Sequence, residues 1–463
     1  MEHSGKHFIA IIGGSVAGSE AAYMLAKKGF RVVVFDQKNL PYGKIEDGLP
    51  KWHVGLRNKE ERLIDERLNH PNIRFVPGFR LGQDATLDEL ANQWGFSAVI
   101  IAIGAWLDRK LPLEGIEKFK NNGLIYQNDL LFWYNHHHEP NYKGPNYELK
   151  DGTCVIGGGL ASIDVVKMIM IDLAQRALKK QKGIDIDIFT FEKKGIAQIL
   201  EDNSTSLREL GVKGCSLFYR RNAEDMPLYP RKGDSPEDLL KAKQVTEKLL
   251  KNYQNKYLFQ FEPRCIPKEF TEENGKLTGI TFQHVQIENG QLTETDEHLH
   301  FDTEMLISSI GSLPEELPSI PYNGSYLSTY GEFGHRVKGF DNVFAIGNVV
   351  TGKGNIVDSK KHGREITSKI IDDHFADVTF EDPMEEKYFN YFRKVESETG
   401  DRLDDLISEL ESSEAHSDEE ILFILKITQR LQEKVGYDGD YQKWVDDHRP
   451  VRLEEAQNLS SKK

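Results

Sequence analysis

Residues 8–36 read FIAIIGGSVAGSEAAYMLAKKGFRVVVFD and carry the strongest structural signal at the start of the chain. An apolar run precedes a glycine-rich turn, small apolar residues follow at helical spacing over 19–28, and a second apolar run, 31–35, ends at Asp36. This order predicts a buried strand, a tight turn, a helix and a second, parallel strand. Such a turn can bind a pyrophosphate at the helix N-terminus, and the acid can accept hydrogen bonds from ribose hydroxyls.

The candidate nucleotide-binding residues of this first turn are Gly13, Ser15, Val16, Ala17, Gly18 and Asp36. Ser15 stands where the commonest pattern has its middle glycine, and we expect a small side chain to leave the site usable. The alternative is an ordinary strand–helix turn without a nucleotide.

A second turn follows in residues 153–162, TCVIGGGLAS, with a helix expected over 163–177. The next strand of this unit is delayed to 215–219 and ends in two arginines instead of an acid. A guanidinium pairs with a 2′-phosphate, which an acid would repel, so NADP(H) is favoured over NAD(H). A solvated arginine pair is the alternative. The candidate residues are Gly157, Gly159, Leu160, Ala161, Arg220 and Arg221.

A third glycine segment, 343–356, predicts a strand end, a small-residue loop and a helix from about 356 to 371. The free N–H groups of that helix could face a flavin, where negative charge develops on reduction, so FAD is the expected first nucleotide. A loop without a ligand is the alternative. The candidate residues are Gly347, Asn348, Gly354, Asn355 and Ile356.

Strands at 98–104 and 305–311 both end in glycine and are expected to be the crossings between two nucleotide domains; Gly104 is therefore a further candidate. The predicted fold class is α/β, with two Rossmann-like dinucleotide-binding domains and a C-terminal helical extension. The FAD domain is predicted to be discontinuous, 1–104 and 318–378, with the NADP domain, 105–317, inserted. Amphipathic helices are expected over 379–463, packed on their own chain; a partner-docking role is the alternative.

Composition excludes several classes of protein. The chain has 463 residues, a net charge of −15 and three cysteines. Its acidity argues against a nucleic-acid partner, and it has no apolar run long enough for a membrane span and no signal-peptide pattern. A cytoplasmic protein is expected. The cysteines form no CxxC pair and no zinc framework, so no metal site is predicted, and His136-His137-His138 is interpreted as a solvated loop.

Five segments together resemble the adrenodoxin reductase-type ferredoxin–NADP reductases, over roughly residues 7 to 375. These are PYGKIEDGLPKWH at 41–53, FWYN at 132–135, GGGLASID at 157–164, YRRNAEDMP at 219–227, which is also similar to glutamate synthase small subunits, and GNVVTGKGNI at 347–356. Departures are Asn348 where the family often has Trp, Asn355 where it has Gly, and Glu46-Asp47 in place of an arginine before Gly48, a candidate FAD-binding residue.

The resemblance implies a flavoprotein that oxidises NADPH and passes single electrons from FAD to a ferredoxin, or to a flavodoxin in its place, with reversal allowed. It also implies that His53 and Asp164 lie near the flavin and the nicotinamide, as residues for positioning and redox tuning. Two alternatives stay open. One is an electron-input subunit similar to the glutamate synthase small subunit, and the other is a non-catalytic nucleotide-binding regulator. The oligomeric state is left open.

Overall fold

The computed structural model describes residues 4–229, 235–288, 290–318, 320–330, 335–350 and 383–457. The described residues form two compact units. The first unit draws on 1–49, 53–107 and 313–463, and the second on 50–52 and 108–312. The chain passes between them in the short strands β5 (Leu107–Asp108) and β14 (Ser312–Leu313).

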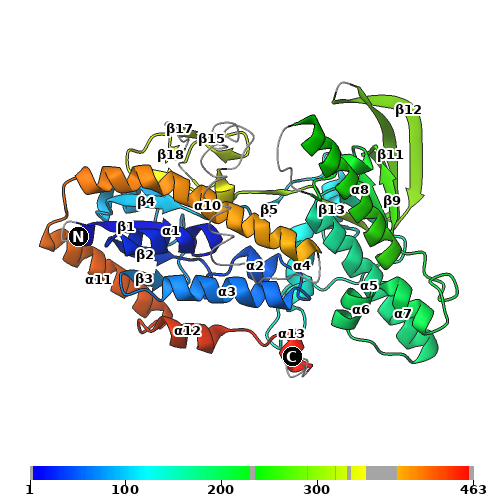
Figure 1. Cartoon of the computed structure of the whole chain (residues 1–463), viewed down its shortest axis with the longest axis horizontal. Helices are drawn as coiled ribbons and strands as arrows, with labels where there is room; N and C mark the ends of the chain where they lie inside the picture. Colours follow the sequence, from blue (N-terminus) through cyan, green and yellow to red (C-terminus); the bar gives the residue numbers. More distant parts are fainter. Residues whose placement is uncertain are drawn as a thin grey trace. The chain divides into compact units, whose positions relative to one another are not determined.

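The first unit is built on a seven-stranded sheet of order β17-β18-β19-β4-β1-β2-β3 (Figure 1). Its strands are β1 (Phe8–Ile12), β2 (Arg31–Phe35), β3 (Ile73–Val76), β4 (Ala98–Ile101), β17 (Thr329–Tyr330), β18 (Arg336–Val337) and β19 (Val343–Ala345). The strands from β19 to β3 run parallel, while β17 and β18 are antiparallel additions at one edge. Every residue of β1 is buried, as expected for a central parallel strand covered on both faces.

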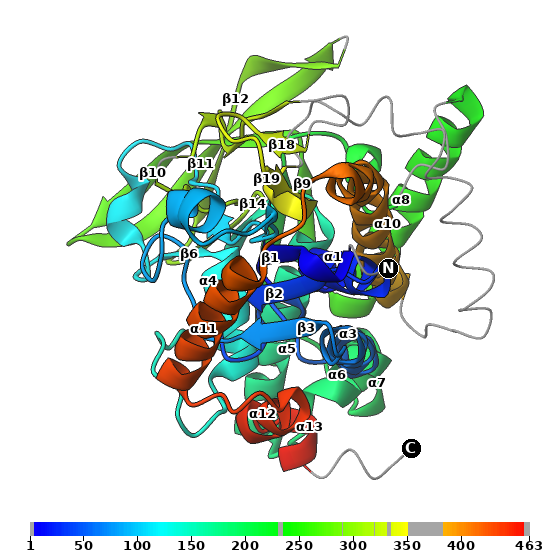
Figure 2. The ribbon, with the colours of Figure 1, turned by 90° about the vertical axis from the view of Figure 1, so that its left-hand side faces the viewer.

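Helices cover both faces of this sheet (Figure 2). Ile9 and Ile11 face a core formed with α1 (Val16–Lys27), α3 (Val54–Leu68), α10 (Pro383–Ser412) and α12 (Tyr441–His448). Ala10 and Ile12 point to the opposite face, which α11 (Asp418–Val435) helps to cover. The described part of the unit also contains two short helices, α2 (Lys44–Asp47) and α13 (Leu453–Ala456). The prediction that the C-terminal helices pack on their own chain is confirmed.

The second unit contains a five-stranded parallel sheet of order β6-β13-β7-β8-β9. Its strands are β6 (Leu124–Tyr126), β7 (Cys154–Gly157), β8 (Ser216–Tyr219), β9 (Gln260–Pro263) and β13 (Leu306–Ser309). Its helices are α4 (Gln127–His136), α5 (Leu160–Lys182), α6 (Ile188–Lys194), α7 (Ile196–Asp202) and α8 (Pro236–Tyr257). The two parallel sheets, each with a glycine turn after a central strand, confirm the predicted fold class.

One element of the second unit was not predicted. Strands β10 (Cys265–Glu273), β11 (Lys276–Glu288) and β12 (Gln291–Asp302) form a separate antiparallel sheet. Its inner face packs on the parallel sheet, where the rings of Phe282 and Phe218 stack at 3.9 Å. Glycine turns carry a strong local signal, whereas these strands are rich in exposed polar residues and have a weaker apolar pattern.

Candidate dinucleotide sites

The first glycine turn joins β1 to α1 and leaves no room for side chains. Gly13 has a φ of +99°, and a Cβ atom there would lie 2.6 Å from the carbonyl oxygen of Ala102. A Cβ atom at Gly18 would lie 1.8 Å from the carbonyl oxygen of Gly13. Glycine at both positions lets the helix start close to the strand end, where its free N–H groups meet the edge of the sheet. Ser15 is the N-cap of the helix, and its Oγ donates to the carbonyl oxygen of Tyr42 at 2.9 Å.

Asp36 follows β2 at the same edge of the sheet. Its carboxylate accepts hydrogen bonds from the backbone N–H groups of Gly14 and Lys38, both at 2.9 Å. Removal from water raises the pKa of Asp36 to about 6, although the two N–H donors act in the opposite direction. A buried acid held in this position can accept hydrogen bonds from the hydroxyl groups of a ribose.

Two further glycines end neighbouring strands of this sheet. Gly104 follows β4 with a φ of +69°, and Gly347 follows β19 with a φ of +70°. Because β19, β4, β1 and β2 are adjacent and parallel, these residues share one sheet edge with Gly13 and Asp36. A Cβ atom at Gly347 would lie 3.0 Å from the Cβ of Ala17, so the third glycine segment lies directly against α1. Tertiary structure thus brings two distant glycine motifs together.

Five other predicted residues of the FAD site are less informative. Asn348 donates from Nδ2 to the hydroxyl of Tyr391 in α10, a partner that the sequence did not suggest. Gly48 is the C-cap of α2. Gly354, Asn355 and Ile356, with the helix expected to start there, lie outside the described residues.

His53 is the N-cap of α3, and only 1% of it is exposed. Its Nδ1 lies 3.4 Å from Oε1 of Glu385, and its ring makes an edge contact with Tyr388 at 5.7 Å. Both partners come from the first turns of α10. The resemblance pointed to His53, but no local pattern links it to a helix more than 300 residues later.

The second turn joins β7 to α5 in the same manner. A Cβ atom at Gly157 would lie 2.3 Å from Oγ of Ser162, so helix and strand are again closely packed. Gly159 is the N-cap of α5, and a Cβ atom there would meet nothing within 4 Å. The helix then begins with Leu160 and Ala161, whose N–H groups have no acceptor within the helix. Open space beside free N–H groups suits the close approach of a pyrophosphate.

Asp164 lies on the buried face of α5, with none of its surface exposed. Oδ1 of Asp164 is 3.8 Å from Nζ of Lys167, which is also fully buried. Lys167 in turn binds Oε1 of Glu192 at 2.9 Å, and the Tyr257 hydroxyl donates to the carbonyl oxygen of Glu192 at 2.8 Å. Lys167 also lies 5.0 Å from the ring centre of Trp52. A buried positive charge therefore balances the predicted site acid.

Lys51 is a second buried cation in this unit, missed by the sequence analysis. Its Nζ lies 4.2 Å from the ring centre of Tyr134. Burial lowers the pKa of Lys51 to about 7, although Asp172 acts in the opposite direction. The FWYN segment at 132–135, which contains Tyr134, was matched to a family pattern in the sequence, but no contact with Lys51 was predicted from it.

Arg220 and Arg221 directly follow β8, at the edge of the sheet that carries the second glycine turn. Arg220 is exposed and Arg221 is half-buried. Nη1 of Arg221 donates to the carbonyl oxygen of Gly290, at the tip of the β11–β12 hairpin, at 3.2 Å. The predicted arginine pair therefore lies at the same sheet edge as the second glycine turn.

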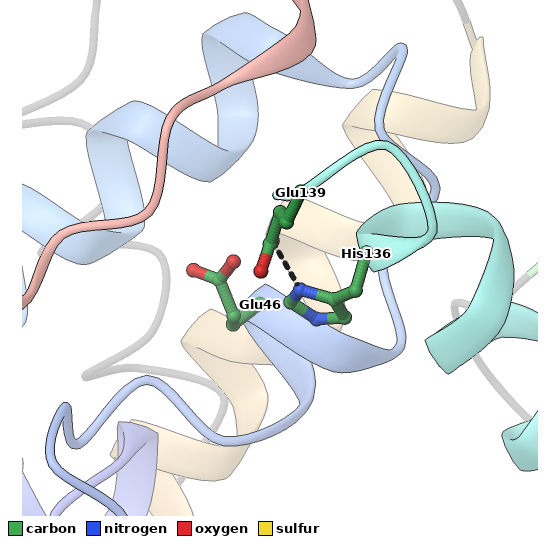
Figure 3. A group of neighbouring side chains, drawn as sticks. All are labelled: Glu46, His136 and Glu139. Atoms are coloured by element: carbon green, nitrogen blue, oxygen red, sulfur yellow. Dashed lines mark hydrogen bonds and ion pairs between the residues drawn. The ribbon is translucent and has the colours of Figure 1, made fainter. Parts of the chain in front are cut away.

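The interpretation of the histidine triplet as a solvated loop was wrong for its first member. His136 is buried at the end of α4, and its Nδ1 is hydrogen-bonded to Oε1 of Glu139 at 2.6 Å (Figure 3). Helix α4 continues through His136, and the imidazole ring lies on its buried side. Glu46, also drawn in Figure 3, belongs to the first unit and forms an ion pair with Arg452 there.

All three cysteines of the chain are buried and unpaired. Burial raises the pKa of the thiol of Cys154 to about 12 and that of Cys265 to about 11, and it also raises the pKa of Cys215. A buried thiol of high pKa is a poor nucleophile. The arrangement can therefore hold two dinucleotides but offers no cysteine pair as an electron acceptor.

Comparisons with known proteins agree with this geometry. Residues 7–177 match the pyridine nucleotide-disulphide oxidoreductase family. The mitochondrial NADPH:adrenodoxin oxidoreductase of Arabidopsis thaliana is 24% identical over 348 residues, which cover 68% of each chain. A probable ferredoxin/ferredoxin–NADP reductase of Mycobacterium leprae is 24% identical over 335 residues, which cover 68% of this chain and 56% of the relative. Glutamate synthase small chains match over shorter stretches.

FprA of Mycobacterium tuberculosis, solved in complex with NADPH, has a similar fold, with a TM-score of 0.64 and 18% identity. The match covers 92% of this chain and 91% of FprA, which is more than residues 1–375 could supply. The likeness in fold therefore extends into the C-terminal helices, beyond the predicted limit of the resemblance. In the described part of the chain, no helix is long and apolar enough to cross a membrane. The chain thus has homologues named NADPH:adrenodoxin oxidoreductase and ferredoxin–NADP reductase, and it has an FAD/NAD(P)-binding fold like that of FprA.

Proposed function

We propose that this protein binds FAD in its first unit and NADP(H) in its second, and that it passes electrons from NADPH through FAD to a ferredoxin-like one-electron acceptor. The observation that carries the proposal is the contrast between the two glycine turns. The strand after the first turn ends in Asp36, which suits a ribose, and the strand after the second ends in Arg220 and Arg221, which suit a 2′-phosphate. Bound FAD would accept a hydride from NADPH and release electrons singly, which no side chain can do.

The residues present fit both cofactors. In the first unit, Gly13 and Gly18 let α1 start close to the end of β1, where a pyrophosphate would approach the helix, and the Asp36 carboxylate would accept hydrogen bonds from a ribose. In the second unit, Gly159 is open and the arginines supply the phosphate partners. Each good guanidinium–phosphate contact contributes roughly 1.5–3 kcal/mol, so about a 10- to 100-fold preference for NADPH over NADH is expected.

His53 and Asp164 are proposed as positioning and redox-tuning residues for the flavin and the nicotinamide, respectively. Hydride transfer needs no protein acid or base, but it does need the two rings held at contact distance with suitable electrostatics. Their burial supports this role, since a His held by Glu385 and a carboxylate balanced by Lys167 have few alternative orientations. We expect variants of either residue to slow flavin reduction more than they weaken nucleotide binding.

The first experiment measures colour and its response to substrate. The purified protein should carry a flavin absorbance band that bleaches under anaerobic conditions with NADPH, and much more slowly with the same concentration of NADH. A protein that stays yellow with NADPH would exclude the proposed activity. Equal bleaching by the two nucleotides would exclude the role of the arginine pair.

The acceptor is the second part of the proposal. We favour ferredoxin, with flavodoxin as a substitute, and place the reaction in the cytoplasm. NADPH-driven reduction of ferredoxin, flavodoxin, thioredoxin and a quinone should show fast reduction of the first two. Fast reduction of thioredoxin would contradict the argument from the buried cysteines.

An electron-input subunit, similar to the glutamate synthase small chain, is the second candidate. The observation that favours it is the second glycine turn with YRRNAEDMP at 219–227, which resembles those chains. Such a subunit would co-purify with a specific larger enzyme and would reduce free ferredoxin slowly. Size-exclusion chromatography of the tagged protein from its native cells separates the two candidates.

A further inference from the structure

A third arginine lies beside the predicted phosphate site. Arg264 directly follows β9, and β9 is the parallel neighbour of β8, with Pro263 opposite Tyr219 in the register. The carboxyl ends of parallel neighbours meet at one edge of the sheet, so Arg264 and Arg221 are side by side. The backbone N–H of Arg264 donates to the carbonyl oxygen of Arg221 at 3.1 Å, which confirms the placement.

The backbone of Arg264 adopts an unusual conformation. Its φ is +58°, in the left-handed region that favours glycine and asparagine, so the backbone is strained at this residue. Both of its peptide groups are held in place, because its carbonyl oxygen also accepts from the N–H of Val285 in β11 at 2.8 Å. Strain of this kind often occurs at active sites and ligand-binding sites.

The positive charges at this edge have no carboxylate partner in the described part of the chain. Arg220, Arg221 and Arg264 make no ion pair among the described residues. There, their guanidinium groups make a single hydrogen bond, from Arg221 to the carbonyl oxygen of Gly290. Most other arginines of the chain that are half-buried or more, such as Arg57, are paired with acids. Three arginines at the ends of two adjacent strands, with no carboxylate paired to them in the described residues, make this edge of the sheet attractive to an anion.

We propose that Arg264 is a specificity-determining residue for NADP(H), acting with Arg220 and Arg221 on the 2′-phosphate. This inference rests on the proposed function, because it deepens the assignment of the same site. A phosphate monoester carries nearly two negative charges and three terminal oxygens, which is more than one guanidinium can satisfy. Arg221 and Arg264 would approach it from two adjacent strands, and the strained backbone holds the second of them at the sheet edge.

The test measures binding of the phosphate-bearing half of the cofactor, without any electron transfer. Calorimetry on the purified, flavin-containing protein gives the dissociation constants of 2′,5′-ADP and of 5′-AMP. Arg264→Asn removes the guanidinium while keeping a residue that tolerates the left-handed backbone. It should weaken 2′,5′-ADP at least about 10-fold and leave 5′-AMP unchanged, and the thermal midpoint of the variant should not fall.

Two other variants complete the comparison. Arg221→Gln should weaken 2′,5′-ADP to a similar degree. Arg208→Gln is the matched control, because Arg208 is an exposed arginine of the same unit with no strand-edge position, and this change should leave both constants unaltered. If Arg264→Asn fails to fold, Arg264→Gln replaces it in the same measurements.

The outcomes test the role of Arg264 separately from the proposed binding of NADP(H). Loss of affinity in Arg221→Gln but not in the Arg264 variant would overturn the inference and leave the NADP assignment standing. Unchanged affinity in both variants would overturn the assignment of the site itself. Equal weakening of 2′,5′-ADP and 5′-AMP by Arg264→Asn would show that the residue only shapes the backbone, and would also overturn the inference.

Discussion

The C-terminal helix α10 is held to the nucleotide-binding core by buried ion pairs, and breaking one of them should destabilise the first unit. Arg393 in α10 forms an ion pair with Glu60 in α3 and with Glu396 at 2.5 Å. Glu396 also binds Arg67 of α3 at 2.9 Å. These side chains are 2–10% exposed, so water cannot replace a lost partner. The change to test is Arg393→Met, which removes the charge that lies over the Phe389 ring and leaves an unbranched apolar side chain in its place.

The expected cost follows from the burial. Removing one partner of a buried ion pair leaves an uncompensated charge and costs about 3–5 kcal/mol. For a unit of this size, that corresponds to a fall in the thermal midpoint of roughly 6–20 °C. The neighbouring pair Lys394–Glu398, 3.7 Å apart with Lys394 62% exposed, provides a matched control. Lys394→Met should cost at most about 1 kcal/mol.

The pH dependence gives a second, independent check. Burial raises the pKa of Glu60, and the charge of Arg393 opposes this. Without Arg393 the folded-state pKa of Glu60 rises further above its unfolded value, so the folded variant gains protons relative to the unfolded chain as the pH falls. The loss of unfolding free energy in Arg393→Met, relative to the unmutated protein, should therefore be largest near about pH 8 and shrink toward about pH 5.

Thermal unfolding followed by far-UV circular dichroism measures both effects, and limited proteolysis reports release of α10. A midpoint for Arg393→Met within about 2 °C of that for Lys394→Met at the higher pH would refute the reasoning. So would a deficit that grows as the pH is lowered.

Three other outcomes are expected. Gly18→Ala should abolish FAD retention or folding, because its Cβ would lie 1.8 Å from the carbonyl oxygen of Gly13. Gly159→Ala should fold normally, because a Cβ atom there meets nothing within 4 Å. Flavin absorbance and circular dichroism of the two variants test both expectations. FAD affinity should weaken as the pH falls through about 6, because Asp36 becomes protonated there and its carboxyl group loses acceptor capacity. Fluorescence titration of FAD binding measures the affinity at each pH. In Asp36→Asn the affinity should not change with pH in this range. Ellman's reagent should find almost no reactive thiol in the native protein and all three in urea, since every cysteine is buried; rapid native reaction would contradict the structure.

Much of the fold could be predicted because its signals are local. Each glycine turn, with its flanking strand and helix, lies within about 30 residues, and the close packing at Gly18 and Gly157 requires glycine for steric reasons. The helix limits were less accurate: α1 begins at Val16 and α5 runs from Leu160 to Lys182, longer than the predicted 163–177. Helix ends depend on capping and on neighbouring elements that the apolar pattern does not contain.

The candidate site was predicted in outline and completed by contacts distant in sequence. His53 and Asp164 were identified through resemblance, but their partners Glu385 and Lys167 follow from the packing of α10 and from the buried face of α5. The buried position of His136 was missed because three adjacent histidines suggest a polar loop, while the structure continues the helix through the first.

Two dinucleotide turns, one followed by an acid and the other by arginines, could be predicted from the sequence because neighbouring residues form these features. Which distant segments share a sheet edge depends on the tertiary structure. Parallel strands place their carboxyl ends together whatever their separation in the chain, so Gly347 meets α1 and Arg264 meets Arg221. Likewise, the acidic C-terminal region, with 22 acids and 12 bases from residue 381, looked like an appendage. Its charges are partly buried in pairs with α3, and that depends on packing alone.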